Sequence, residues 1–392
     1  MKHDLKAKIS CNFPLYSPFS LAAILIGLLA AGNSFFQAAP QYANLAESLM
    51  RGKLYLLSMP TGWGDTSFFE GYYYWPLGVL PAILLIPFVW TGLYHQGALS
   101  FALVLGIFYL CFRLAQKLDY SREDACWFAI AFCFGTSFIG VAAVPVSWSY
   151  ATAVAVLFLF LAIHEWEGSR RLPVIGLFVG LAMASRPLTG LNSLFFAGAV
   201  LCLMAPWKKK ISSLAQFTAP VALIALAIGW YNFQRFGNPL ETGYAYQIDA
   251  YGRMVAEMSL PGNNPGPLFS LANIPDHFRV FAFGPPEEGA IGCSVFLMSP
   301  FLVFLLTWSR KWNTMDYMLG ANVLVLMVVT LAFRSTGARQ IGYRFTLEYL
   351  PFVFWLLMRR RRELNRGFKY LVGLAVIIDL ALVVYYASVR FI

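Results

Sequence analysis

The sequence predicts an all-α integral membrane protein, a polytopic helical bundle that forms one domain over residues 1–392. Of its 392 residues, 59% are hydrophobic and 17% are aromatic, while only 12% are charged. Soluble domains carry roughly 25% charged residues. So few charges cannot cover so much apolar surface in water, which excludes a soluble enzyme, a disordered chain and a nucleic-acid-binding protein.

A series of apolar segments justifies the helical fold, because a membrane-spanning helix needs about 20 mostly apolar residues. These segments are 19–37, 76–94, 97–115, 124–143, 146–164, 173–185, 189–206, 214–234, 290–308, 316–333, 345–358 and 368–388. We predict 11–13 spans from them.

Basic clusters next to the apolar segments predict the topology, since cytoplasmic loops are enriched in Lys and Arg. They place 165–171, 207–213, 309–315 and 359–367 inside, which leaves 38–75, 235–289 and 334–344 as outer loops. The same clusters suit anionic membrane lipids. The four segments between 76 and 164 then need an odd number of crossings. One of them is therefore re-entrant or interfacial, or the loop at 113–124 lies outside.

The first outer loop contains a predicted amphipathic helix. One face carries Tyr42, Leu45, Ala46, Leu49 and Met50, and the other carries Asn44, Glu47, Ser48 and Arg51. Such a helix lies in the membrane interface with its apolar stripe in the acyl boundary. Glu47 and Arg51 are four residues apart in the favourable order for an ion pair, which favours a structural role for Glu47 over a catalytic one.

An aromatic segment follows, in which Phe68, Phe69 and residues 72–75 surround Glu70, close behind Asp65. Aromatic residues are ordinary at a membrane boundary. Four in a row beside two carboxylates suit a sugar site, because sugar faces stack on rings while carboxylates bind hydroxyls.

Arginine is concentrated in the third outer loop, at Arg334, Arg339 and Arg344. This excess of arginine in an outer loop opposes the positive-inside trend and predicts an anionic ligand, since guanidinium groups match phosphate oxygens. The alternative is a salt bridge between Arg344 and Glu348, one helical turn away. Arg186 lies at the outer end of a short apolar segment and is a fourth candidate, with snorkelling to the interface as its alternative.

These residues together resemble the GT-C superfamily of membrane glycosyltransferases, in its bacterial protein-mannosyltransferase and aminoarabinose-transferase-like branch. The resemblance covers about 19 to 358. It is carried by an apolar helix at 19–37, the interfacial helix at 43–52, Asp65 with 70–81, Arg235-Phe-Gly-Asn-Pro-Leu-Glu-Thr-Gly-Tyr244, and 340–351.

The resemblance implies a GT-C-like fold and transfer of a sugar from a polyprenyl-phosphate carrier to an extracytoplasmic acceptor, which is a glycan, a lipid or a protein. It also implies the bacterial inner membrane. The family's acid usually follows the first helix directly, but residues 37–42 here contain no carboxylate. Asp65, Glu70 or Glu47 then takes the role of base, or the chain is a non-catalytic membrane scaffold.

Physical reasoning selects Asp65 as the base, with Glu70 second, because displacement of a lipid-linked phosphate needs a carboxylate near the acceptor hydroxyl and cations near the phosphate. The cations are Arg186, Arg339 and Arg344. Further contacts to sugar and carrier are assigned to Glu241, Tyr244, Tyr246, Gln340 and Tyr343. No cofactor is predicted. The histidines and cysteines are isolated in the sequence, so no metal site is predicted, and a need for a divalent metal stays open.

The main alternative is a polytopic transporter or flippase for a lipid-linked or anionic substrate. Transporters hold polar groups near the bilayer centre. Polar residues here concentrate in outer loops, and Asp379 in the last segment is the main exception.

Overall fold

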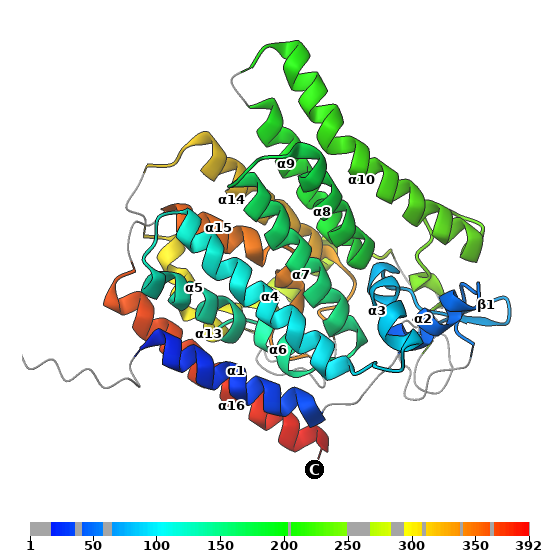
Figure 1. Ribbon diagram of the computed structural model, residues 1–392, viewed down its shortest axis with the longest axis horizontal. Coiled ribbons are helices and arrows are strands. Elements are labelled where there is room, and N and C mark those ends of the chain that lie inside the picture. The colour runs from blue at the N-terminus through cyan, green and yellow to red at the C-terminus, as the bar shows by residue number, and fades with distance from the viewer. Residues whose placement is uncertain are drawn as a thin grey trace, which may run out of the picture.

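The computed structural model describes residues 17–35, 41–57, 65–202, 205–248, 267–283, 294–307, 311–337, 340–360 and 364–391. These residues are helical apart from loops, isolated bridges and one antiparallel hairpin (Figure 1). The hairpin pairs β1 (Ser67–Phe69) with β2 (Tyr72–Tyr74), so that Phe68 faces Tyr73.

The helices follow the predicted apolar segments closely. They are α1 (Pro18–Phe35), α2 (Gln41–Met50), α3 (Leu80–Trp90), α4 (Gln96–Lys117), α5 (Arg122–Phe134), α6 (Phe138–Ala143), α7 (Ser147–Trp166), α8 (Leu172–Ser185), α9 (Asn192–Leu201), α10 (Trp207–Phe236), α12 (Ile274–Ala282), α13 (Val295–Met298), α14 (Thr314–Ala332), α15 (Leu350–Arg360) and α16 (Arg366–Phe391). Short 3-10 helices are η2 (Pro187–Leu191), η3 (Tyr244–Tyr246), η4 (Leu271–Asn273), η5 (Pro300–Leu305) and η6 (Arg344–Glu348).

Five of the described helices, α4, α7, α10, α14 and α16, are long and apolar enough to cross a membrane. Shorter apolar helices add to them. The chain is therefore an α-helical integral membrane protein, as predicted. The number of 11–13 spans stays a prediction.

Several predicted segments are not continuous α-helices: 189–206 begins in η2 before α9, and 345–358 divides into η6 and α15. Segment 124–143 breaks after Phe134 into α5 and α6, and the described part of 290–308 forms only α13 and η5. Pro300 lacks the N–H that would continue a helix. Ser299 next to it donates a hydrogen bond of 2.9 Å to the carbonyl of Gly135, which satisfies a backbone group at the break after Phe134, as burial in a membrane protein requires.

The core is centred on α5, whose residues from Ala125 to Phe134 are all buried except Trp127. The ring of Phe132 packs against Phe138, Phe160 and Phe354 at centroid distances of 5.3, 4.8 and 5.0 Å. Helices α6, α7 and α15 thus meet around α5.

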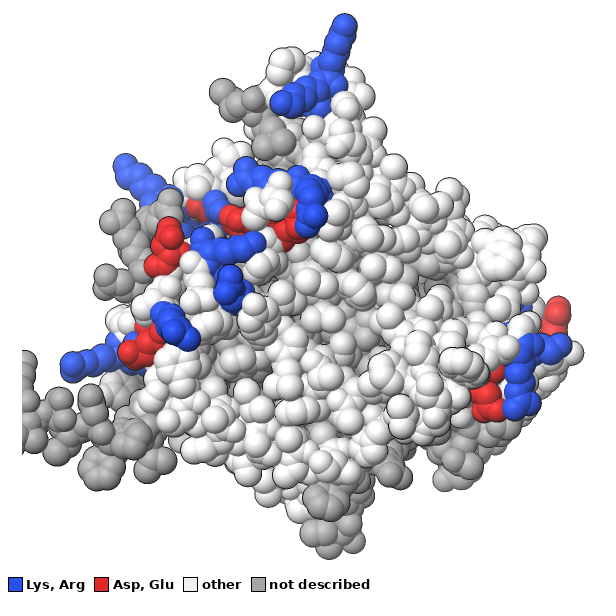
Figure 2. Space-filling model, in the orientation of Figure 1, with Lys and Arg blue, Asp and Glu red and all other residues white. Residues whose placement is uncertain are grey.

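Charged side chains gather at opposite ends of the molecule. Figure 2 shows them toward the left and upper edges and at the right edge, with a broad uncharged surface between. We call one end the basic end; it holds the connections between α4 and α5, α7 and α8, α9 and α10, and α15 and α16. The other, the site end, holds α2, the hairpin, 244–248, 333–337 and 340–348. An uncharged band between two charged ends is the pattern of a protein that crosses a bilayer.

The three predicted outer loops meet at the site end. Ser67 bridges to Gln247, and Phe269 bridges to Phe333. Segments that are far apart in sequence therefore share one face, as the topology predicted.

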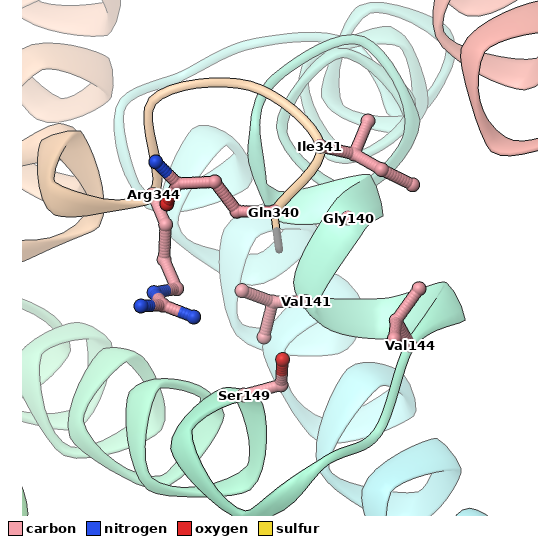
Figure 3. A pocket seen from close by; sticks show the side chains of 7 residues that line it. All are labelled: Gly140, Val141, Val144, Ser149, Gln340, Ile341 and Arg344. Atoms are coloured by element: carbon pink, nitrogen blue, oxygen red, sulfur yellow. The ribbon is translucent and has the colours of Figure 1, made fainter. Parts of the chain in front are cut away.

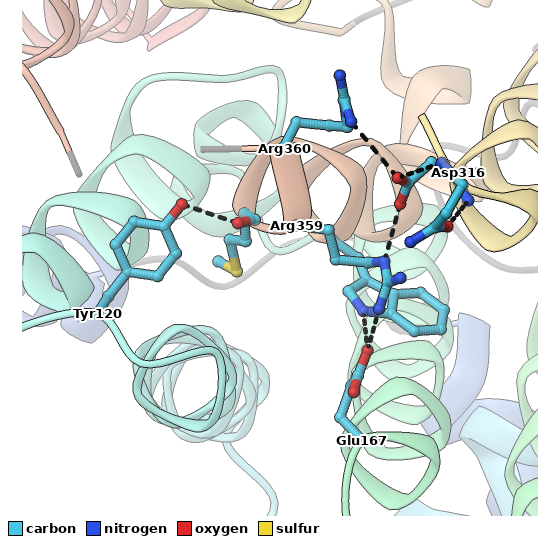
Figure 4. A network of polar contacts seen from close by, with 8 residues as sticks. Tyr120, Glu167, Asp316, Arg359 and Arg360 are labelled. Atoms are coloured by element: carbon cyan, nitrogen blue, oxygen red, sulfur yellow. Dashed lines mark hydrogen bonds and ion pairs between the residues drawn. The ribbon is translucent and has the colours of Figure 1, made fainter. Parts of the chain in front are cut away.

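A polar network closes the basic end (Figure 4). Glu167 accepts hydrogen bonds from the Trp355 indole at 2.7 Å and from Arg359 at 3.1 Å. Arg359 also binds Asp316 at 3.1 Å, and Arg360 contacts the other oxygen of Asp316 at 3.5 Å. These contacts join α7, α14 and α15.

The loop at 113–124 also lies at the basic end, because Lys369 binds Glu123 at 3.0 Å and Asp124 at 2.9 Å. This position at the basic end favours the interpretation in which one of segments 76–94 and 97–115 does not cross. Helix α4 is long and apolar enough to cross a membrane. Helix α3 begins at the site end: Gly78 before it lies against the backbone of Ala184 and Ser185, where a Cβ would come within 2.1 Å of a carbonyl oxygen.

The amphipathic helix α2 forms as predicted, and Glu47 pairs with Arg51 at 2.6 Å on its exposed face. The expectation that its apolar stripe lies in the acyl boundary is wrong. Tyr42, Leu45 and Ala46 are buried in a cluster with Trp75, Leu80, Leu85, Tyr150 and Val154. Ser48, assigned to the polar face, is also buried, and its hydroxyl donates to the carbonyl of Asn44 at 2.8 Å.

Candidate functional site

A buried ion pair joins the end of α8 to η6. The Nε and Nη2 groups of Arg186 donate to one oxygen of Glu348, at 2.8 and 2.6 Å. Arg186 is 7% exposed and Glu348 is 2% exposed. Burial opposes the charge of Arg186, but the attraction of Glu348 outweighs it and raises the pKa of Arg186. The alternative pairing of Arg344 with Glu348, considered from the sequence, is wrong, because Glu348 pairs with Arg186.

Arg344 is buried beside this pair, with 9% of its surface exposed. Its Nε and Nη1 groups have no hydrogen-bond partner among the described residues. The guanidinium lies 5.8 Å from the ring centroid of Trp148 and 5.7 Å from that of Phe345, within the range of cation–π attraction.

The electrostatic surroundings of Arg344 disfavour its charge. Burial lowers its pKa to about 9, and repulsion by Arg186 acts in the same direction. Asp65, Tyr244 and Glu348 oppose this shift. At pH 7 Arg344 keeps its proton, so a buried positive charge remains in this part of the molecule.

Arg344 lines a pocket between α6, the start of α7 and the loop before η6 (Figure 3). The lining residues are Gly140, Val141, Val144, Ser149, Gln340, Ile341 and Arg344. The guanidinium extends toward Ser149. The pocket has room for about one water molecule, so a phosphate contacts Arg344 here only when the side chains around it shift.

Gln340 is held by its own loop. Its Nε2 group donates to the carbonyls of Thr336 at 2.6 Å and Gly337 at 2.9 Å. Its Oε1 atom is buried without a hydrogen-bond partner among the described residues. Gln340 therefore offers an acceptor in the pocket that contains the donors of Arg344.

Asp65 lies at the entrance to β1 in a left-handed backbone conformation, with φ of 72°. Aspartate adopts this conformation more readily than most residues. Its side chain is exposed, and its charge favours the protonated forms of Arg344 and Arg334. The acid of the first loop therefore lies within electrostatic range of two arginines of the third loop.

Arg334 joins a second loop to this group. Its Nη2 donates to Gln247 at 2.9 Å and to the carbonyl of Tyr244 at 3.3 Å. Arg334 is one of the arginines concentrated in the third outer loop, but it is not among the cations predicted for the phosphate; the predicted Arg339 lies outside the described residues. We refer to Arg186, Arg334 and Arg344 with Asp65 and Glu348 as the arginine cluster.

Two tyrosines border the arginine cluster. The predicted Tyr244 is half-buried; burial raises its pKa, while Arg186 and Arg344 oppose the shift. Tyr42 was assigned only to a packing face. Its hydroxyl is buried, faces Trp75 without hydrogen-bond geometry to any described residue, and feels the charge of Arg186. The sequence contained one signal for a functional role of Tyr42: it lies within 37–42, where the resemblance implies a catalytic acid.

Other predicted residues lie in a separate aromatic group. The ring of Tyr246 packs against that of Phe69, with 4.6 Å between the ring centroids. Burial raises the pKa of Tyr246, and the charges of Glu241 and Glu70 act in the same direction. Glu70 is exposed at the turn of the hairpin, and Glu241 accepts a 2.6 Å hydrogen bond from the backbone of Gly243. The structure therefore brings Glu70, Glu241 and Tyr246 together, but away from the ion pair.

The predicted Tyr343 packs in the protein interior. It is fully buried, and its ring meets Phe281 at 5.5 Å and Phe345 at 5.8 Å. Its hydroxyl is 3.5 Å from the carbonyl of Thr330, the limit of a hydrogen bond. Tyr343 thus supports the loop that carries Arg344.

Within the described residues, no three His, Cys, Asp or Glu side chains are grouped as metal ligands. In comparisons with known proteins, no family model, curated protein or solved structure matches the chain.

Proposed function

We propose that the protein is a membrane glycosyltransferase that moves a sugar from a polyprenyl-phosphate carrier to an acceptor glycan, lipid or protein. One observation carries this proposal. The buried guanidinium of Arg344, whose Nε and Nη1 lack a hydrogen-bond partner among the described residues, lies within electrostatic range of the exposed carboxylate of Asp65. A cation for a departing phosphate and a base for an attacking hydroxyl are the two groups that this reaction needs.

In the proposed reaction, Asp65 accepts the proton of an acceptor hydroxyl while that oxygen attacks C1 of the sugar. The bond between C1 and the phosphate oxygen breaks, and the phosphate leaves with the electron pair. Arg344, supported by Arg334, stabilises the charge on the leaving group. The exposure of Asp65 favours contact with an acceptor that arrives from water.

The aromatic group beside the hairpin suits the sugar. Tyr246 and Phe69 present rings near Glu70 and Glu241, and carboxylates next to rings bind sugar hydroxyls. We assign the site end to the extracytoplasmic face of a bacterial inner membrane, because the opposite end carries the basic loops that stay in the cytoplasm.

Transfer by purified full-length protein tests the proposal, with a polyprenyl-phosphate sugar as donor. Asp65→Asn is expected to lower kcat by roughly 10²–10⁴-fold, the usual contribution of a general base. Arg344→Gln is expected to lower transfer as well. Glu47→Gln serves as the matched control, since Glu47 lies on the exposed face of α2 and pairs with Arg51.

Full activity of both Asp65→Asn and Arg344→Gln would contradict the proposed site. Loss of activity in Glu70→Gln, with Asp65→Asn active, would move the base to Glu70.

A transporter is a second candidate because of Asp379. This residue is fully buried in α16, and neither carboxyl oxygen has a hydrogen-bond partner among the described residues. Ionisable groups inside the membrane commonly mark proton or ion pathways. Uptake of a lipid-linked or anionic substrate by reconstituted vesicles, abolished by Asp379→Asn and unaffected by Asp65→Asn, would favour transport over transfer.

A further inference from the structure

The charges of the arginine cluster do not cancel. Among the described residues, the carboxylates of Asp65 and Glu348 act on the charges of Arg186, Arg334 and Arg344. Three positive groups and two negative groups leave one positive charge. The buried members alone, Arg186 and Arg344 with Glu348, give the same result.

The carboxylate of Glu348 is one of the groups that determine this net charge. It neutralises Arg186 through two hydrogen bonds to a single oxygen. Its second oxygen, Oε2, is buried without a hydrogen-bond partner among the described residues. Its charge is therefore poorly screened, and it acts on Arg344 and Tyr244. A ligand next to Arg344 meets a guanidinium whose Nε and Nη1 lack a hydrogen-bond partner among the described residues, with the carboxylates of Asp65 and Glu348 acting on it.

We propose that Glu348 is a specificity-determining residue, which matches the site to a lipid phosphodiester with one negative charge and rejects a diphosphate diester with two. This inference rests on the proposed lipid-phosphate ligand. A single anion balances Arg344. A second negative charge finds Arg334 already matched by Asp65, and it meets the carboxylate of Glu348 in a poorly hydrated region, where like charges repel strongly.

The competing explanation is structural. Trp148 and Phe345 partly compensate the charge of Arg344, and Glu348 then serves only to hold Arg186. The two explanations differ in what happens when Glu348 loses its charge. A structural role changes stability, whereas a role in specificity changes the ratio of two affinities.

The test measures binding of farnesyl methyl phosphate and farnesyl methyl diphosphate to the full-length protein in detergent. These probes share a prenyl chain, carry one and two charges, and contain no sugar. Binding is followed by calorimetry and by the fluorescence of Trp148 against a Trp148→Phe variant. The wild type is expected to prefer the monophosphate by about tenfold or more, the size of one uncompensated charge in a partly buried site.

Glu348→Gln is expected to shift this ratio toward the diphosphate by about tenfold, because the cluster gains one positive charge. The double variant Arg186→Gln with Glu348→Gln removes one charge of each sign, so the preference for the monophosphate returns. Asp316→Asn is the matched control: it removes a buried carboxylate that also pairs with arginine, at the basic end, and leaves the ratio unchanged.

Arg344→Gln is expected to weaken both probes. An unchanged ratio in Glu348→Gln, or a ratio in the double variant that follows Glu348→Gln, would overturn the inference. So would binding of both probes that does not depend on Arg344. If the probes bind as expected but no sugar is transferred, the proposed transferase function fails while the assignment of Glu348 stands.

Discussion

At the scale of single residues, Arg344 is the most informative side chain. A buried charge is costly unless it is paired and hydrogen-bonded, and the nearby carboxylate of Glu348 is already bound by Arg186. Arg344, the first residue of η6, is therefore held as a buried cation at a cost in stability. Such a cost is common where a protein binds an opposite charge.

The pKa of Arg344 predicts the pH dependence of anion binding. In the free protein this pKa is lowered to about 9 by burial and by Arg186. A bound anion favours the charged guanidinium and raises that pKa, so the complex holds the proton more tightly than the free protein. The affinity for farnesyl methyl phosphate is therefore expected to be constant near pH 7 and to fall as the pH rises through about 9.

Calorimetry between pH 6.5 and 10.5 measures this dependence. Arg344→Gln provides the control, and its residual binding is expected to be flat across the range. An equal fall in both proteins would assign the titration to another group.

The sequence predicted part of this site. The excess of arginine in an outer loop indicated Arg344, and the turn before the aromatic segment indicated Asp65. The ion-pair partner of Glu348 could not be predicted from the sequence, because Arg186 and Arg344 are both chemically suitable and Arg186 is 162 residues away along the chain. Spacing along a helix favoured Arg344, but η6 is a 3-10 helix, in which residues four apart do not align as in an α-helix.

At the scale of elements, α3 shows the limit of hydropathy. Segment 76–94 is as apolar as its neighbours, yet α3 has 11 residues, roughly half of what a span requires. One face of α3 is buried against α2 and α7, whereas Ile83, Leu84, Phe88 and Trp90 are exposed. The composition of a segment predicts that it avoids water, but it does not predict whether the segment packs inside the protein or crosses the lipid.

Thiol labelling tests the position of α3, in a background without the native cysteines. Lys53→Cys before α3 and Leu93→Cys after it are both exposed positions. A membrane-impermeant reagent is expected to modify both from the same side of sealed vesicles. Arg122→Cys, at the start of α5, is expected to react only from the other side. Labelling of positions 93 and 122 from one side, opposite to 53, would show that α3 crosses.

At the scale of the whole molecule, polar contacts tie the bundle together at both ends. Arg186 and Glu348 connect α8 to the segment before α15, and Glu167, Asp316 and Arg359 connect α7, α14 and α15 at the basic end. The apolar core between them was predictable as a class from composition. The pairing of helices was not, because most apolar faces are interchangeable until such polar contacts select partners.

Glu167→Gln is expected to destabilise the protein by about 1–3 kcal/mol, because it removes one acidic partner from the partly buried Arg359, which keeps Asp316. Glu47→Gln removes an exposed pair with side chains 48–63% accessible, and is expected to cost at most about 0.5 kcal/mol. Thermal unfolding in detergent compares the two. Equal melting temperatures would show that the network at the basic end contributes little.

The length of α10 has a consequence for how the protein sits in its bilayer. Its 30 residues extend about 45 Å at 1.5 Å each, whereas the hydrocarbon layer is about 30 Å thick. Only 6% of its most apolar window is buried inside the protein. An inclined helix fits this thickness mismatch. Gly176 of α8 touches its backbone at Phe217, so thinner or thicker bilayers would turn α10 about this pivot and carry Phe236, beside the hairpin, with it.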